Sequence, residues 1–345
     1  MRNFPLRHIQ RFVGLGILLA FFFVLDIAIG SVTIPPSEIV KALFGFPEVQ
    51  ESWSNIVWKF RLPRTITALI AGAGLAISGL LMQTLFRNPI AGPFVLGISS
   101  GASLGVAILV LATGWVASFL PLSPMSSWSM VLAATFGSFL VLLIVLSVSW
   151  RVRDIATLLI VGLMIGSATS ALVTVLEYFS DKESLKRFIL WGMGSLTAVT
   201  WKELNLLIPI VFAGLVWTFF LSKSLNVLLI GEDYAMTSGL NIKRARYQVI
   251  AVTAILAGSI TAFCGPIAFI GIAIPHFARM VFRTQQHQVL IPATIITGMV
   301  VLIFCDILAQ LPFFEGQLPI NAITSLMGAP IVIWIVLNRR SIGSD

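Results

Sequence analysis

The chain has little charge and few of the side chains that carry most catalytic or metal chemistry. Asp, Glu, Lys and Arg make up 10% of its 345 residues, and it contains 2 Cys, 3 His and 3 Tyr. Soluble domains average about 25% charged residues, so this composition excludes an ordinary soluble protein. Cys264 and Cys305 both lie inside apolar runs. We expect them to be small packing residues that form neither a disulfide nor a metal pair.

Two sequence signatures of enzymes are also missing. Gly is nowhere followed directly by Lys, which excludes the Walker A loop that binds ATP phosphates. The zinc-protease pattern H-E-x-x-H does not occur either. We therefore predict that the chain is not an enzyme and has no catalytic residue, no metal site and no cofactor of its own.

The chain consists mainly of apolar sequence. Hydrophobic residues make up 58% of it, and the mean hydropathy is +0.99, as expected of a protein that crosses a membrane several times. The net charge of +8 could suggest a nucleic-acid partner, but basic residues in such chains usually lie in cytoplasmic loops. No basic face is interleaved with stacking aromatic residues, so we predict no nucleic-acid binding.

The most informative stretch begins at Arg61-Leu-Pro-Arg64. The 22 residues from Thr65 to Phe86 follow without one charge, and Arg87-Asn-Pro89 ends the stretch. A helix needs about 20 residues to cross a hydrocarbon core of about 30 Å. The stretch therefore predicts a spanning helix with paired arginines at one end and an Asn-Pro break, suited to a gate, at the other.

Similar stretches predict ten spans in an all-α polytopic membrane protein. The first follows Arg2, Arg7 and Arg11 without a small-x-small cleavage site, so we expect it to be retained. No charge occurs from Asn88 to Trp150, a length that needs two crossings and a turn at the prolines between them. The expected spans are 12–31, 65–86, 93–112, 128–149, 155–176, 204–221, 247–263, 267–280, 289–305 and 320–337.

The charges predict the orientation of these spans. Ten crossings place both termini on one side, and 14 of the 22 Lys and Arg then fall in the termini and even-numbered loops. The positive-inside rule assigns these regions to the cytoplasm. Asp26, Glu177 and Asp306 lie near outer span ends, where we expect interfacial residues rather than a proton relay. The energy for any transport should then come from outside this chain.

The longest charged cytoplasmic loop covers about residues 223–246. It contains Gly231-Glu-Asp-Tyr-Ala-Met-Thr-Ser-Gly239-Leu240, in which apolar residues lie between polar ones. This pattern predicts one or two short helices along the membrane surface with a hinge at Gly239. An ordinary solvated loop is the alternative.

Nine short blocks carry a resemblance to a known family. They are Arg61-Leu-Pro-Arg64, Ala71-Gly-Ala-Gly-Leu-Ala-Ile-Ser-Gly79, Met82-Gln83, Asn88-Pro-Ile-Ala-Gly-Pro93, Leu96-Gly-Ile-Ser-Ser-Gly101, Gly265-Pro-Ile-Ala-Phe-Ile-Gly271, Ile274-Pro-His-Phe-Ala-Arg279, Leu318-Pro-Ile320 and Gly328-Ala-Pro330. In this order they resemble the FecCD-type permeases, the membrane subunits of ABC importers for cobalamin, ferric siderophores and haem. The resemblance covers about residues 10–340, and several blocks in order are far more specific than any one alone.

The resemblance implies one cobalamin-permease-like transmembrane domain over residues 1–345, paired with a second permease subunit, with the path at the subunit interface. Because one chain supplies a complete ten-span unit, we expect a homodimer. Two ATP-binding cassette subunits, which would hold ATP and Mg²⁺, would sit on the loop 223–246. A periplasmic or lipid-anchored binding protein would deliver the cargo, and the assembly would lie in the lipid of the bacterial inner membrane.

Several site residues are also implied by the resemblance. Arg61 and Arg64 would dock acidic residues of the binding protein, and Gln310 stands where the family often has a further docking Arg. The residues matching the ATPase-coupling loop are Gly231, Glu232, Ala235, Gly239 and Leu240.

The cytoplasmic gate is implied in the same way. Asn88 and Ile90 match one gate segment. Ile155 and Ala156 stand in the other, where the cobalamin permease has small hydroxyl residues, so the closed constriction would be more apolar.

Together these features predict a permease subunit that moves an iron–siderophore, haem or cobalamin-type chelate by ATP-driven alternating access. The alternative is an ion-coupled secondary transporter for a small organic solute. Such a carrier would need a coupling-ion site in the membrane, and the scarcity of acids inside the spans speaks against it.

Overall fold

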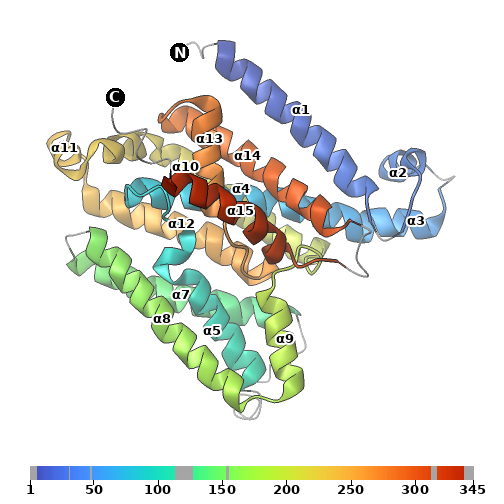
Figure 1. The fold of residues 1–345 in the computed structure, drawn as a ribbon, viewed down its shortest axis with the longest axis horizontal. Helices are drawn as coiled ribbons and strands as arrows, with labels where there is room; N and C mark the ends of the chain where they lie inside the picture. The colour runs from blue at the N-terminus through green and yellow to red at the C-terminus, as the bar shows by residue number, and fades with distance from the viewer. Residues whose placement is uncertain are drawn as a thin grey trace.

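The computed structural model describes residues 6–30, 32–46, 49–112, 127–152, 155–311 and 317–337. Within these ranges the regular secondary structure is entirely helical (Figure 1). The predicted all-α fold is therefore confirmed.

Each of the ten predicted spans coincides with an apolar helix. Seven helices in the described part of the chain are long and apolar enough to cross a membrane, and three shorter apolar helices complete the set. The long ones are α1 (Leu6–Ala28), α4 (Leu62–Leu85), α7 (Ser127–Arg151), α8 (Ile155–Phe179), α10 (Trp201–Ile230), α12 (Ile242–Cys264) and α14 (His287–Ala309). The shorter ones are α5 (Ile98–Leu111), α13 (Ile270–Phe282) and α15 (Ile320–Leu337).

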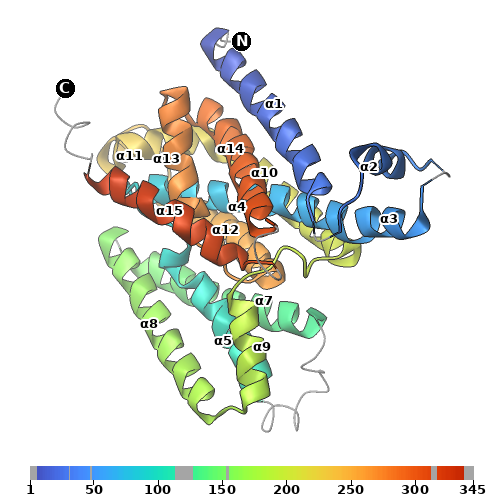
Figure 2. The same ribbon diagram turned by 45° about the vertical axis from the view of Figure 1, so that its right-hand side comes forward.

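Short helical elements connect these ten. They are α2 (Pro36–Leu43), α3 (Glu51–Ile56), the π-helix η1 (Val57–Arg61), the 3₁₀ turn η2 (Pro93–Leu96), α9 (Lys182–Gly192) and α11 (Glu232–Thr237). In Figures 1 and 2 the helices α5, α7, α8 and α9 form one group, and α1 leans against the opposite side of the remaining bundle.

The second span begins earlier than the sequence predicts. The elements α3, η1 and α4 form one apolar helix over Glu51–Leu85, so the two arginines lie inside a helix and not in front of it. Pro63 lacks a backbone N–H and would clash with the carbonyl four residues before it in a regular α-helix. The wider π turn at Val57–Arg61 ends two residues before this proline, where an insertion in the hydrogen-bond ladder relieves that conflict.

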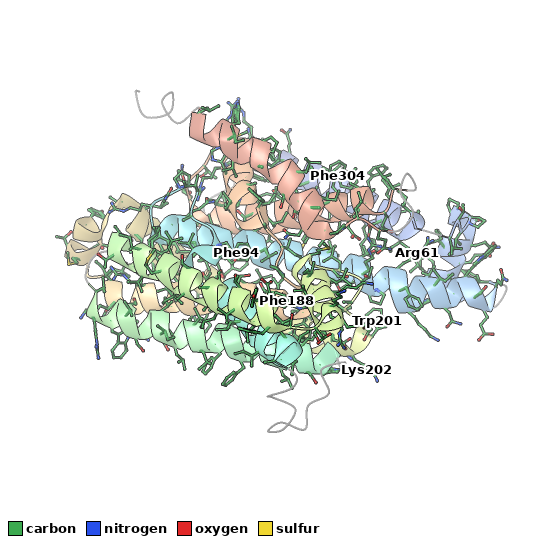
Figure 3. All side chains as sticks on the ribbon, turned by 60° about the horizontal axis from the view of Figure 1, so that its bottom comes forward. Arg61, Phe94, Phe188, Trp201, Lys202 and Phe304 are labelled. Atoms are coloured by element: carbon green, nitrogen blue, oxygen red, sulfur yellow. The ribbon has the colours of Figure 1, made fainter. Side chains whose placement is uncertain are left out.

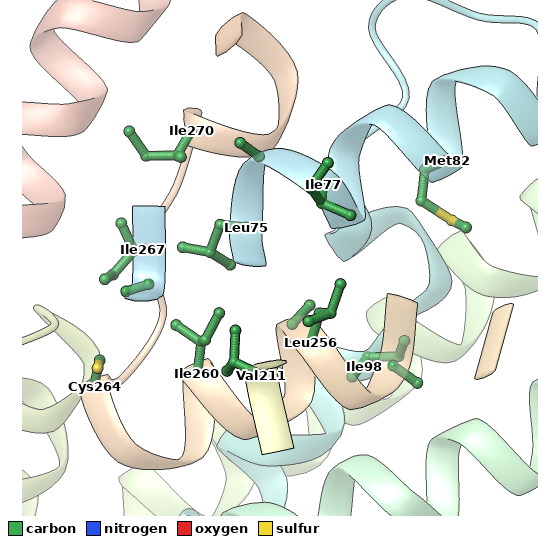
Figure 4. Close-up of a cluster of buried hydrophobic side chains, with 14 of the residues drawn as sticks. Leu75, Ile77, Met82, Ile98, Val211, Leu256, Ile260, Cys264, Ile267 and Ile270 are labelled. Carbon is green, nitrogen blue, oxygen red and sulfur yellow. The ribbon is translucent and has the colours of Figure 1, made fainter. Parts of the chain in front are cut away.

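Helix α4 forms the centre of the fold. Of its most apolar 18-residue window, 83% is buried inside the chain, against 11% for α1 and 17% for α8. Figure 4 shows Leu75 of α4 among Ile267 and side chains of α10 and α12, such as Val211 and Ile260. A helix buried on nearly all sides can pass a displacement from one neighbouring helix to another. Helix α8, in contrast, keeps a large apolar face uncovered.

Glycines bring the central helices into backbone contact. A Cβ at Gly72 would overlap the carbonyl of Gly298 in α14, and a Cβ at Gly79 would overlap the carbonyl of Gly271 in α13. Gly101 of α5 packs in the same way against α7. Such close approach supports helix association in lipid, where the hydrophobic effect contributes little.

Candidate functional site

Six polar residues gather where α1, α4 and α14 meet, and we call this group the arginine–carboxylate cluster. All six are buried, each less than 10% exposed. Its members are Asp26, Arg61, Arg64, Thr65, Asp306 and Gln310. Buried charges are costly unless they are paired, so the contacts inside the cluster decide what each residue can do.

Arg64 and Asp306 form a two-pronged ion pair. Nε of Arg64 donates to Oδ2 of Asp306 at 2.7 Å, and Nη2 donates to Oδ1 at 2.6 Å. Parallel bonds of this kind are among the strongest side-chain hydrogen bonds. The pair fastens the start of α4 to the end of α14.

The second carboxylate is held by neutral donors. Thr65 Oγ1 donates to Oδ2 of Asp26 at 2.6 Å. Gln310 Nε2 donates to Oδ1 of Asp26 at 2.9 Å and to Oδ2 of Asp306 at 3.2 Å, so Gln310 bridges the two carboxylates. The expectation that Asp26 and Asp306 are interfacial is therefore wrong, because they are 2% and 1% exposed and satisfied inside the protein.

Arg61 binds the end of the first helix. Its guanidinium donates to the carbonyl oxygens of Ile27 at 2.8 Å, Ala28 at 2.9 Å and Val32. The last carbonyls of a helix have no partner within the helix, and a cation there also complements the helix dipole. A Cβ at Gly30 would lie 2.9 Å from Nη2 of Arg61, so a side chain there would press on the guanidinium.

The cluster opens onto a cavity of about 370 Å³ that Arg61, Arg64 and Gln310 line together with Lys59. Lys59 is exposed, and sequence reasoning did not single it out. Its position two residues before Arg61 is the only signal that could have drawn attention to it. Figure 3 places Arg61 and Trp201 on the same side of the bundle, where Trp201 Nε1 donates to the carbonyl of Trp58 at 2.6 Å.

Two of the predicted gate residues, Asn88 and Ile90, follow the far end of α4. Asn88 donates its N–H to the carbonyl of Gln83 at 3.1 Å, and its side chain accepts from the N–H of Ile90 at 3.2 Å. These bonds form a compact turn in which Ile90 is exposed. Ile155 starts α8 and Ala156 is exposed. No hydrogen bond between described residues joins Ala156 to the turn, so the gate stays a prediction.

The predicted coupling residues lie in the short helix α11, which Glu232 begins, and at its two ends. Ala235 is fully buried and anchors the helix. The N–H of Gly239 donates to the carbonyl of Met236 and that of Leu240 to the carbonyl of Ala235, both at 3.0 Å. With φ +81° at Gly239, this is a Schellman ending, which needs a left-handed residue.

This geometry bears on two expectations for the loop. A single helix forms there, and Gly239 ends it by hydrogen bonding rather than leaving a loose hinge. The neighbouring spans also extend toward it, because α10 runs to Ile230 and α12 starts at Ile242. Residues 231–241 therefore make the connection within the segment 223–246.

The described residues also bear on metal binding and on hydrolase chemistry. Within the described ranges, no group of three or more His, Cys, Asp or Glu residues could hold a metal ion. The segment Gly97-Ile-Ser99-Ser-Gly101 matches the G-x-S-x-G pattern of hydrolases, but a 3₁₀ turn and not a strand precedes it. Ser99 is buried at the start of α5, and no histidine in the described part of the chain is hydrogen-bonded to it.

Comparison with known proteins identifies relatives over nearly the full length. The model of the FecCD transport family matches residues 18–338. The vitamin B12 import system permease protein BtuC of Klebsiella pneumoniae is 36% identical over 330 residues, which cover 96% of this chain and 94% of that protein. The protein of the same name from Salmonella typhimurium is 33% identical over 332 residues, covering 96% of both.

A solved structure has the same fold. It is described as an inward-facing conformation of an ABC transporter of the metal-chelate type, and it superposes with a TM-score of 0.82. The identity is 28%, and the match covers 94% of this chain and 98% of that one.

Proposed function

The chain belongs to the FecCD transport family, and on this premise we propose that it carries vitamin B12 or a metal chelate across the bacterial inner membrane as the permease of an ATP-driven importer. The names of its relatives support this substrate class. The structural observation that carries the proposal is α11, a short anchored helix with exposed Tyr234 and Met236. Such a projection offers a surface to a separate ATP-binding subunit.

ATP binding would act on the permease through α11. Ala235 anchors this helix, and the left-handed Gly239 leads directly into α12. A force applied to Tyr234 or Met236 would therefore move α11 and α12 together. We propose that this movement opens and closes the gate at Asn88, Ile90, Ile155 and Ala156 and gives alternating access.

The binding protein would dock at the other end of α4. Arg61 and Arg64 are largely engaged in hydrogen bonds within the chain. Acidic side chains of the partner would reach them through the 370 Å³ cavity that they line. Lys59 at its mouth is the accessible cation and would make the first contact. Gln310 bridges the two carboxylates, and we assign it a positioning role rather than direct docking.

A second permease copy would cover the apolar face of α8. Only 17% of its apolar window is buried in the single chain, so this face is free for lipid or for another subunit. Helix α15 lies beside α13 and α14 and leaves Leu326 and Ile333 exposed. These two helices are our candidates for the walls of a path between subunits.

The secondary-transporter alternative has one observation in its favour. Asp26 and Asp306 are buried carboxylates joined through Gln310, a kind of group that proton-coupled carriers use. The ion pair with Arg64 occupies one of them, which supports a structural role. The energy source therefore separates the two functions.

The experiment uses the tagged chain purified from its native membranes and reconstituted in vesicles. We expect an ATP-binding subunit to co-purify and the uptake of labelled vitamin B12 or a ferric chelate to require ATP. Gly239→Val should separate ATP hydrolysis from uptake, because a β-branched residue is strained at φ +81°. Gly45→Val is the matched control, since Gly45 has φ +72° and is equally open. Uptake by the chain alone that collapses with the proton gradient would establish the alternative.

A further inference from the structure

A second cavity lies at the end of α4 away from the arginine–carboxylate cluster. It has a volume of about 640 Å³. Its lining comes from the turn with Arg87 and Asn88, the last residues of α10 and the face of α13 that carries His276 and Arg279, together with Gln83 of α4 and Gln285. None of the proposed steps above uses its basic residues.

Arg279 is held in place by a neutral partner. Its Nη1 donates to Oε1 of Gln83 at 2.6 Å, and Nε2 of Gln83 donates to the carbonyl of Ile272 at 2.9 Å. The ion pairs between described residues are Lys41–Glu38 and Arg64–Asp306, and no Asp or Glu is among the residues that line the cavity. Since a guanidinium carries five N–H donors, most of the donors of Arg279 remain available to a ligand.

Arg87 brings a second positive charge to the same space. Its backbone is left-handed, with φ +46°, and a Cβ at Gly231 would lie 3.4 Å from its Nη1. The side chain of Arg87 therefore reaches from the gate turn to the residue that precedes α11. Asn88, Gln285 and His276 add further polar groups to the lining.

We propose that this cavity binds the phosphate group of an anionic ligand between Arg87 and Arg279. One guanidinium group can donate two parallel hydrogen bonds to the oxygens of a phosphate. Basic pockets between membrane helices suit lipid headgroups. The volume lies within the range of about 300–1,000 Å³ that is usual for small-ligand sites. Ile230 and Met280 line the cavity and are 64% and 43% exposed, so an acyl chain could leave along an apolar rim. The phosphate belongs either to a phospholipid headgroup or to a free phosphate compound.

Occupancy would link two moving parts. The cavity touches Asn88 of the predicted gate and Ile230, the residue directly before Gly231 of the predicted coupling residues. A ligand held by Arg87 and Arg279 would join these parts and favour one arrangement of them. This consequence rests on the proposed function, whereas the binding itself does not.

The test measures binding to the full-length chain in phosphatidylcholine nanodiscs. One arm adds inorganic phosphate with sodium chloride at equal ionic strength as the control, and the other replaces part of the lipid by phosphatidylglycerol. The readouts are the thermal midpoint of unfolding and the phosphatidylglycerol retained in native mass spectrometry. We expect at least one arm to raise the midpoint in a saturable way.

Three variants localise the effect. Arg279→Gln and Arg87→Gln should each weaken the response about tenfold, as expected for loss of one charged hydrogen-bond donor. Arg87 is exposed, so its variant should fold even if Arg279→Gln does not. Lys243→Gln removes an exposed cation outside this cavity and should leave the response unchanged.

The arms also identify the source of the phosphate. A response to phosphatidylglycerol alone assigns a lipid headgroup, and a response to inorganic phosphate assigns a soluble compound. No response in either arm, or an equal loss in all three variants, would overturn the proposal. If an ATP-binding subunit covers Arg87 and no phosphate response is seen, the proposal is overturned too, and the cavity is assigned to a protein contact. All of these measurements are independent of transport, so they stand even if the proposed function fails.

Discussion

The Arg64–Asp306 pair allows a quantitative test of what the arginines at the start of α4 do. Arg64→Met removes the cation that pairs with Asp306. Asp306 and nearby Asp26 are 1% and 2% exposed, and Arg61 is then the one positive charge left in the cluster. Removing one member of a buried pair costs about 3–5 kcal/mol because the other charge stays buried. We expect Asp306→Asn to destabilise the protein by a similar amount.

The double variant separates the pair from its surroundings. In Arg64→Met/Asp306→Asn neither charge remains, so the loss should be smaller than the sum of the two single losses. Contacting residues usually show coupling energies of about 0.5–3 kcal/mol, and two short parallel bonds place this pair in the upper part of that range. Unfolding by sodium dodecyl sulfate in mixed micelles, followed by circular dichroism, measures each free energy.

A matched control tests the docking role. Lys59→Met alters an exposed residue and should change stability by no more than about 0.5 kcal/mol, while it weakens stimulation of ATP hydrolysis by the binding protein. If Arg64→Met leaves stability unchanged and reduces only that stimulation, Arg64 is a free docking group. A coupling energy near zero would likewise refute the structural reasoning.

Three further predictions follow from single contacts. Gly79→Ala should destabilise the protein by about 1–3 kcal/mol, because the methyl group would overlap the backbone of Gly271. Gly14→Ala should not, because an added Cβ there has no neighbour within 4 Å outside its own stretch of helix. Equal effects in the same unfolding assay would contradict this. His287→Ala removes a fully buried ring with hydrogen bonds on both nitrogens. It should lower the free energy of unfolding by about 1–3 kcal/mol, because the partners of the ring are left unsatisfied. A neutral result would show that water or repacking replaces the ring. Hydrogen bonds from the backbone at the start of α9 hold the pKa of Asp181 below its usual value. The stabilisation of that helix by Asp181 should therefore be complete above about pH 4 and be lost as the pH falls through the lowered pKa. Asp181→Asn should abolish this pH dependence in hydrogen exchange of the α9 amides.

Sequence patterns predicted the helices well because apolar length is a local property. Each predicted span has a matching helix, including the short one that Gly265 and Pro266 separate from α12. The start of the second span was missed because Arg61 and Arg64 looked like charges in front of the membrane segment. In the structure the helix continues through these charges, since carbonyl groups of α1 accept hydrogen bonds from Arg61 and Arg64 is paired with Asp306.

The partners inside the cluster could not be predicted from spacing. Arg64 and Asp306 are 242 positions apart, and nothing in either local sequence shows that α4 and α14 lie side by side. The scarcity of charges in the spans also suggested that acids near span ends face water. Packing reversed this for Asp26 and Asp306, because an arginine, a threonine and a glutamine reach them from neighbouring helices.

The placement of both polar sites on one buried helix suggests how they communicate. The arginine–carboxylate cluster lies at the start of α4, and Arg87 follows its end after 24 helical residues, a length of about 36 Å at 1.5 Å per residue. Between them α4 meets α14 at Gly72 and α13 at Gly79 through backbone contacts, which cannot be compressed as long side chains can. A displacement of α4 at the cluster must therefore move α13 or α14, and α13 carries Arg279 toward or away from Arg87. Docking at one end and the state of the gate at the other would then be coupled through a rigid helix rather than through a chain of flexible side chains.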